Sequence, residues 1–458
     1  MEPNNDLTIK PIPGLIAQLA VPASIGMFFN TMFNVVDTFF AGLISTEAIA
    51  ALSLSFPVFF VILAIGFGIS TGATALIANA LGAGDDTQAR FYAVQSISFS
   101  VLLSIVMMGI GIYVAPFLFK ILGAKDTYLA LSLAYINVIF YGFSFFSLTF
   151  VFNAILTAQG DAKSFRNVLI IGFILNLLFD PWFIYGGFGL PALGLAGVAW
   201  ATILIQFIGS CFMGFHVLRS DLICRECWAM FLPRRRYFWE IAKQGFPASI
   251  NTMTIAIGIF IITWFLSKFG KSAVAAYGIA TRVDQIALLP IMGLTTATLT
   301  LVGQNNGAGL YQRCREVYYK ALLYGLIITT MSMIIVFCFP AAIMGFFTED
   351  VEVINIGAIY LRISAFIYWA YIILFVAVST LQGLKRPFYA IWIGIYRQVL
   401  APALVFYVLS NLLGMGLMGI WWGIFLVNWS ATIFTLLYVR VTMNRMFGSR
   451  GILVPVPD

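Results

Sequence analysis

The chain has 458 residues, of which 61% are hydrophobic and only 9% are charged. A water-soluble protein needs enough polar residues to cover its surface, so this composition excludes an ordinary soluble domain. The net charge of +7 comes from basic residues in short segments between apolar runs. It therefore indicates membrane topology, and we expect no nucleic-acid partner.

Twelve apolar runs are each long enough to cross about 30 Å of hydrocarbon as a helix. They predict an all-α polytopic membrane protein with twelve transmembrane helices. The first run is too long for a cleavable signal peptide, so we expect none. In chain order the runs lie near residues 15–43, 49–79, 90–116, 128–158, 166–187, 192–218, 240–267, 273–303, 316–344, 353–381, 388–410 and 416–440.

The orientation follows from the lysines and arginines in the connections. With a cytoplasmic N-terminus, 18 of them lie on the inner side, and only Lys120, Lys125, Lys268 and Lys271 lie on the outer side. This bias follows the positive-inside rule. We therefore predict a multi-pass protein of the cell (inner or plasma) membrane, with both termini in the cytoplasm.

The two halves of the chain repeat each other. "LAVPASI" at 19–25 recurs as "QGFPASI" at 244–250, a shift of 225, and "GAG" at 82–84 recurs at 307–309 with the same shift. Each half has an even number of spans, so the repeats are parallel. We predict two six-helix lobes related by a pseudo-twofold axis, with a cleft that suits alternating access. The boundaries are 1–218 for the N-lobe, 219–239 for a cytoplasmic linker and 240–458 for the C-lobe.

A set of polar residues inside the spans is confined to the first half. Asp37 lies in the apolar stretch "FNVVDTFFAG" (33–42), and the repeat shift places it on Ile262. Asp180 and Thr202 also correspond to apolar positions in the second half. Because the shared fold does not need these residues, we interpret them as functional.

The helical rise of 1.5 Å per residue places Asp37, Asp180 and Thr202 in one layer, about 9–15 Å below the outer ends of their helices. Asn176 lies four residues before Asp180, on the same helix face. Pro181 frees a backbone carbonyl as a further oxygen ligand. An intramembrane carboxylate is a functional candidate, and a coupled pair can hold a proton, or a sodium ion with Asn and Thr oxygens. The alternative is a buried acid satisfied by local hydrogen bonds.

The parallel repeats and three motifs resemble the multidrug and toxic compound extrusion (MATE) transporters. The motifs are "FNVVDTFFAG", "NLLFDPWF" at 176–183 and "GLAGVAWATI" at 194–203. Acids confined to the first half are similar to the DinF-like branch. The NorM-like branch carries working acids in its second half, whereas the predicted seventh helix here has none beyond Glu240 at its mouth.

This resemblance implies that Asp37, Asn176, Asp180 and Thr202 form the cation-coupling site, with drug bound nearby. Pro22 offers the first helix a place to bend. Phe and Met supply adaptable apolar walls, and the buried charges nearby are negative, so we expect amphiphilic, lipophilic cations as cargo. The residues expected near the cargo are Asn30, Phe33, Asn34, Asn153 and Gln206.

The leading prediction is a multidrug efflux antiporter coupled to H⁺, with Na⁺ as the alternative coupling ion, without cofactor or structural metal. We expect a monomer whose other partner is membrane lipid. One alternative is a lipid-linked oligosaccharide flippase, which should line its cavity with cations. Here only Arg282, Arg362 and Arg397 could reach a cavity, all in the second half. A membrane-embedded enzyme would need a catalytic cluster that the sequence lacks.

Four further patterns have ordinary interpretations. "GISTG" (68–72) fits the hydrolase pattern G-x-S-x-G, but we interpret it as helix-packing glycines, because the one histidine, His216, lies near the opposite end of another span. "CREC" (224–227) is interpreted as cytoplasmic thiols, and "NWS" (428–430) lies within a span. Asp284, two residues after Arg282, is predicted to be a structural acid paired with it.

Overall fold

The computed structural model describes residues 6–121, 124–187, 189–223 and 230–448. The "CREC" motif lies outside these residues, so its interpretation stays a prediction. The described part is almost entirely helical and has no β-strand; its one extended feature is an isolated bridge between Gly187 and Leu190. Backbone polar groups can be satisfied within hydrocarbon by a helix alone, which is why these apolar runs all become helices.

The helices match the twelve predicted spans. In the described residues, ten helices are long and apolar enough to cross a membrane, and two bent pairs bring the number to twelve. The first half contains α1 (Asp6–Ile9), α2 (Ile12–Ile44), α3 (Thr46–Gly82), α4 (Asp86–Ile121), α5 (Asp126–Tyr141), α6 (Phe143–Ala158), α7 (Lys163–Tyr185) and α8 (Leu195–Leu218). The second half contains α9 (Arg235–Ser267), α10 (Lys271–Gly307), α11 (Tyr311–Cys338), α12 (Pro340–Gly345), α13 (Val351–Ala365), α14 (Ile367–Gly383), α15 (Tyr389–Ile395), α16 (Ala401–Phe406) and α17 (Gly416–Gly448), with π-helical turns η2 (Tyr396–Leu400) and η3 (Tyr407–Leu412).

Two of the spans are broken, at equivalent places in the repeat. Helices α5 and α6 meet at 46°, and helices α13 and α14 meet at 49°. The first break falls at Gly142, where a Cβ atom would lie 2.3 Å from the Ile203 side chain of α8. The glycine therefore lets α8 approach the break closely, a feature that hydropathy alone does not reveal.

The chain divides into two compact units, Met1–Ser24 with Ile250–Asp458, and Ile25–Ser249. The divisions fall within helices α2 and α9, a few residues after Pro22 and Pro247. The predicted lobes instead divide the chain at the linker 219–239. A proline in a helix interior removes one backbone hydrogen bond and favours a bend, so both divisions follow points where the helix is weakened.

Close helix crossings explain why these divisions lie inside helices. A Cβ atom on Gly68 of α3 would lie 1.9 Å from the Ser249 hydroxyl of α9, within one unit. In the other unit, a Cβ atom on Gly293 of α10 would lie 2.2 Å from the Ser24 hydroxyl of α2. The two pairs are related by the repeat shift of 225. The interpretation of "GISTG" as helix-packing glycines is confirmed.

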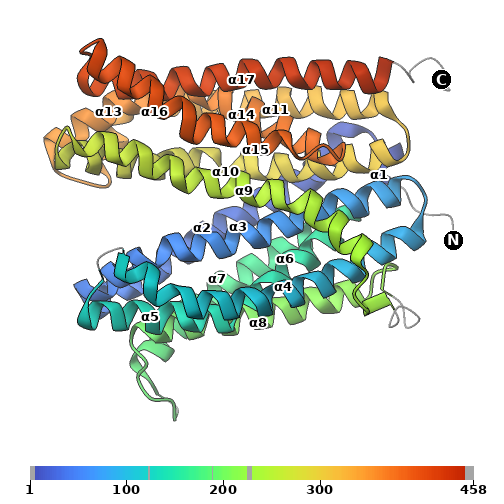
Figure 1. Ribbon diagram of the computed structural model, residues 1–458, viewed down its shortest axis with the longest axis horizontal. Coiled ribbons are helices and arrows are strands. Elements are labelled where there is room, and N and C mark those ends of the chain that lie inside the picture. The colour runs from blue at the N-terminus through green and yellow to red at the C-terminus, as the bar shows by residue number, and fades with distance from the viewer. Residues whose placement is uncertain (1–5, 122–123, 188, 224–229, 449–458) are drawn as a thin grey trace. The chain divides into compact units, whose positions relative to one another are not determined.

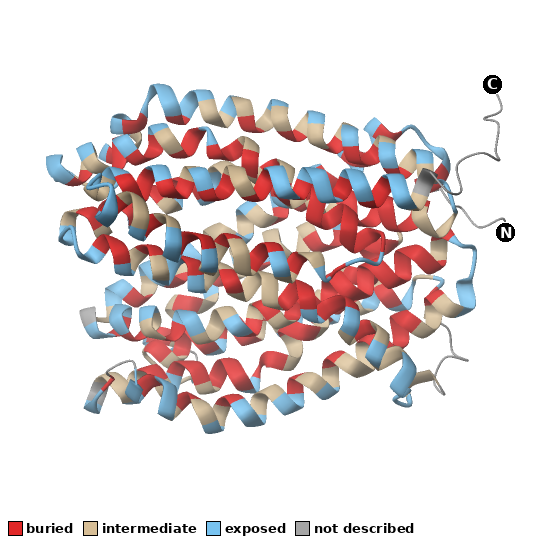
Figure 2. Cartoon of the chain, turned by 45° about the horizontal axis from the view of Figure 1, so that its top comes forward, coloured by how far each residue is buried: buried red, intermediate tan, exposed pale blue. Residues whose placement is uncertain are grey.

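Within the unit Ile25–Ser249, α3 packs against α4, α5 and α6, and α7 packs against α8. In the other unit, α10 packs against α11, α13 and α14, and α14 packs against α17 (Figure 1). Many buried residues lie where helices face one another, while exposed positions follow outward faces (Figure 2). Large apolar side chains such as Phe39, Tyr113 and Phe260 are exposed, as expected for surfaces that face lipid.

Candidate functional site

Helices α2 and α7 bring three of the predicted site residues together. Asn176 and Asp180 lie one turn apart on α7 and are completely buried, and Asp37 on α2 is buried as well. The side-chain amide of Asn176 donates a hydrogen bond to Asp37 Oδ1 at 2.9 Å. The carboxyl groups of Asp37 and Asp180 lie within hydrogen-bonding reach of each other.

The cluster contains more hydrogen-bond acceptors than donors. Both carboxylate oxygens of Asp180 and the side-chain oxygen of Asn176 are buried, and no donor in the described residues bonds to them with good geometry. Buried polar atoms in folded proteins are nearly always paired, so orphaned ones require an explanation. A proton or a cation is the kind of species that would satisfy three orphaned oxygens.

Thr202, the fourth predicted residue, lies on α8, which packs against α7. Its side chain is buried, and its hydroxyl donates to the carbonyl of Val198 at 3.0 Å. Among the described residues, no hydrogen bond joins Thr202 to either carboxyl group. The hydroxyl oxygen still has lone pairs available, so its predicted role as a cation ligand stays a prediction.

Tyr135 is a neighbour that the sequence reasoning missed. It lies on α5, is 4% exposed, and is close enough to Asp37 and Asp180 to interact electrostatically with both. A hydroxyl can donate a hydrogen bond as well as accept one. Nothing in the sequence separates this tyrosine from the other 18, because its role depends on which helix face meets the carboxyl groups.

The predicted cargo-lining residues occupy varied positions. Asn30 and Asn34 on α2 are exposed, and the Asn34 amide donates to the Asn30 carbonyl at 2.8 Å. Phe33, Asn153 and Gln206 are partly buried. Their assignment to a drug site stays a prediction.

The second unit holds another buried carboxylate, with a different environment. Asp284 on α10 accepts hydrogen bonds from Tyr360 at 2.9 Å, Ser364 at 3.1 Å and Tyr368 at 2.7 Å. The predicted pairing with Arg282 is wrong, because Arg282 is exposed while Asp284 is buried among these hydroxyl groups. Tyr360 and Ser364 belong to α13 and Tyr368 to α14, so one carboxylate joins both arms of the bent span.

Arg397 is a buried cation of this unit. It lies in the π-helical turn η2, and its guanidinium carbon is 5.5 Å from the ring centre of Tyr371 and 5.8 Å from that of Phe375. One guanidinium N–H donates to the side-chain oxygen of Asn428 at 3.4 Å. Arg282 and Arg362, the other two arginines that the sequence suggested could reach a cavity, are exposed.

No group of three or more His, Cys, Asp or Glu in the described residues has the geometry of a metal site. Twelve apolar spans with a buried carboxyl pair between two helices define the chain as a polytopic membrane protein, and the similar proteins reported below are transporters. A sequence model of the MatE family matches residues 22–182 and 247–408. The chain therefore belongs to the MatE family, and the two matches begin 225 residues apart, the shift found within the sequence.

Similar proteins cover most of the chain. The "FAD transporter" of Shewanella oneidensis is 27% identical over 402 residues, 87% of this chain and 88% of that protein. The "Probable multidrug resistance protein NorM" of Thermotoga maritima is 28% identical over 418 residues, 89% of this chain and 88% of that one. A MATE crystal structure in the bent conformation matches with a TM-score of 0.91 and 25% identity, over 98% of this chain and 99% of that one.

Proposed function

We propose that this transporter is a multidrug efflux antiporter of the DinF-like branch, driven by protons across the cell membrane. The observation that carries the proposal is the buried Asp37–Asn176–Asp180 cluster with its three orphaned oxygens. Two carboxylates this close cannot both stay ionised in a buried site unless a cation accompanies them. The cluster is therefore built to take up and release positive charge.

A proton is the coupling ion that fits with the fewest requirements. One proton shared between Asp37 and Asp180 supplies the missing donor to the carboxyl pair. A sodium ion needs several oxygens at defined distances, which Asp180, Asn176 and the Thr202 hydroxyl would have to provide together. The proton needs only the carboxyl pair that is already within reach.

The cargo should be an amphiphilic cation. Asp37 is the member of the cluster closest in sequence to the predicted lining residues Asn30, Phe33 and Asn34, so a cationic drug competes with the proton for the same negative charge. Such competition is the coupling that antiport requires. Pro22 gives α2 a site of bending, and the description of a similar MATE structure as bent is consistent with helix bending during alternating access.

The experiment uses purified protein in lipid vesicles, with an ethidium-like cation as cargo and either a pH gradient or a Na⁺ gradient alone. We expect the pH gradient to drive efflux. The isosteric substitutions Asp37→Asn and Asp180→Asn should each abolish efflux, whereas Asp284→Asn is the matched control with a buried carboxylate elsewhere. Full efflux on a Na⁺ gradient, unaffected by an uncoupler, would overturn the proton assignment. Efflux indifferent to both gradients would overturn antiport itself.

A second candidate function is export of an anionic aromatic molecule such as a flavin nucleotide. The observation in its favour is Arg397, a buried guanidinium that lies over the rings of Tyr371 and Phe375, since guanidinium groups bind phosphate and aromatic rings stack on flavins. One relative is named an FAD transporter. FAD efflux that Arg397→Ala removes, with ethidium efflux intact, would favour this candidate.

The flippase alternative has less support. Lipid-linked pyrophosphate cargo needs several cations along a cavity, and of the three candidate arginines only Arg397 is buried. Failure of an anionic lipid-linked sugar to compete with ethidium-like cations is the expected result of a binding assay.

A further inference from the structure

A segment before helix α9 is fixed to helix α4 by a buried glutamine, together with Ser98, whose hydroxyl donates to the carbonyl of Phe231 at 2.9 Å. Gln95, which is completely buried, donates from its side-chain amide to the carbonyl groups of Met230 and of Leu232, the latter at 2.8 Å. Its side-chain oxygen accepts from the backbone N–H of Arg234 at 2.9 Å. A glutamine at this place in an apolar helix is thus committed to holding the backbone of residues 230–234.

The three consecutive arginines that follow have different environments. The guanidinium carbon of Arg234 lies 4.6 Å from the centre of the Phe91 ring. Arg236 forms an ion pair with Glu240 at 3.1 Å, and the Glu240 carboxylate also accepts a hydrogen bond from the Tyr92 hydroxyl. Arg235 is exposed and has no ion pair with any carboxylate in the described part of the chain. Among the described residues of this segment, the Arg235 guanidinium is therefore the one without a carboxylate partner or a ring beneath it.

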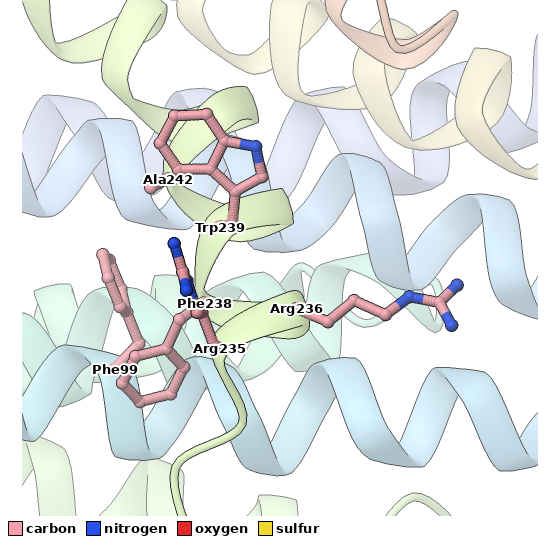
Figure 3. Close-up of a pocket in the computed structure, with 6 residues that line it drawn as sticks. All are labelled: Phe99, Arg235, Arg236, Phe238, Trp239 and Ala242. Atoms are coloured by element: carbon pink, nitrogen blue, oxygen red, sulfur yellow. The ribbon is translucent and has the colours of Figure 1, made fainter.

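Arg235 lines a groove with apolar walls. The groove has a volume of about 660 Å³, and Phe99 of α4 packs edge-on against Phe238 of α9 with ring centres 5.2 Å apart. Trp239 in the wall is 68% exposed. Figure 3 shows the Arg235 guanidinium directed toward Trp239, while Arg236 extends away from the other side chains. The lining residues are Phe99, Arg235, Arg236, Phe238, Trp239 and Ala242.

We propose that this groove binds an anionic phospholipid, with the headgroup phosphate on Arg235 and an acyl chain along Phe99, Phe238 and Trp239. An exposed cation beside an exposed apolar wall is complementary to a molecule with a phosphate at one end and hydrocarbon at the other. The groove lies at the helix ends that the charge bias predicts to be cytoplasmic, where anionic lipids attract basic residues and tryptophan is enriched. A free phosphate would use Arg235 but would leave the apolar wall unused.

Trp239 provides a direct readout in the full-length protein reconstituted in vesicles. Its emission, taken as the difference between the wild type and Trp239→Phe, is measured with brominated phosphatidylglycerol or brominated phosphatidylcholine as quencher. We expect phosphatidylglycerol to quench at about fivefold lower mole fraction, the preference that one cation at a membrane surface supplies. Arg235→Ala should abolish this preference, and Arg235→Lys should retain most of it.

The matched control is Arg440→Ala, which removes an exposed arginine at the same predicted membrane face but in the other unit. It should leave the preference unchanged. Equal quenching by both lipids in the wild type, or a loss equal for Arg440→Ala and Arg235→Ala, would overturn the proposal. If adding excess inorganic phosphate to the vesicles removes the preference for phosphatidylglycerol, the ligand of Arg235 is a free anion and the lipid proposal is wrong. Because the readout does not involve cargo, its result is independent of the transport function.

Discussion

Two of the buried carboxylates, Asp180 and Asp284, should respond in opposite ways when their charge is removed. Asp284 accepts three hydrogen bonds from hydroxyl groups, whereas neither oxygen of Asp180 receives one from the described residues. A substitution at Asp284 therefore removes native bonds, and a substitution at Asp180 removes none. The expected difference is in the free energy of unfolding, separate from any effect on transport.

The expected loss in the free energy of unfolding at Asp284 depends on which carboxylate oxygen each hydroxyl donor bonds to. Ser364 and Tyr368 both bond to Oδ1 of Asp284, and only Tyr360 bonds to Oδ2. Asp284→Asn can keep the Oδ1 pair and lose one bond, a cost of about 0.6–1.7 kcal/mol for a hydrogen bond within a membrane protein. Asp284→Leu has a similar shape and loses all three, about 2–5 kcal/mol. Asp180→Asn adds a donor to a cluster that lacks one, so we expect equal or greater stability.

The assay is thermal unfolding of the purified variants in one detergent at neutral pH, with the monodisperse fraction measured by size-exclusion chromatography after heating. The expected order of melting temperature is Asp180→Asn at or above wild type, then Asp284→Asn, then Asp284→Leu. Equal melting temperatures of Asp284→Leu and Asp284→Asn, or a melting temperature of Asp180→Asn below both, would contradict this order. Efflux activity, measured on the same samples, should be lost in Asp180→Asn and retained in Asp284→Asn.

Other predictions follow from the helix crossings and the site. Gly68→Leu should lower stability by at least about 1–3 kcal/mol, because its Cβ would meet the Ser249 hydroxyl at 1.9 Å; Gly109→Leu, whose Cβ has no atom within 4 Å, is the control for thermal unfolding. Tyr135→Phe removes a hydroxyl group that interacts electrostatically with Asp37 and Asp180, so it should slow efflux about fivefold, as expected for an interaction of about 1 kcal/mol, and should shift the pH profile of transport; an unchanged profile would exclude Tyr135 from the site. Pro22→Ala should slow efflux without lowering the melting temperature, because alanine restores the backbone donor and stiffens α2; unaltered efflux would argue against bending there.

The sequence by itself determined the features that depend on local composition. Each predicted span became a helix or a bent pair because hydrocarbon requires every backbone polar group to be satisfied within its own segment. The shift of 225 determined that Gly68 and Gly293 occupy equivalent positions in the repeat. The isolated acid Asp37 was conspicuous because lipid penalises a charge wherever its helix lies in the membrane.

Only the tertiary structure decided which side chains meet. Asn176 bonds to Asp37 across 139 residues of sequence, and Asp284 takes its donors from 76 to 84 residues away, not from the adjacent Arg282. Tyr135 reaches the carboxyl pair because α5 turns one face toward it. Hydropathy is a property of each segment alone, but partners depend on the rotation and crossing of several helices, which are set by packing among all of them.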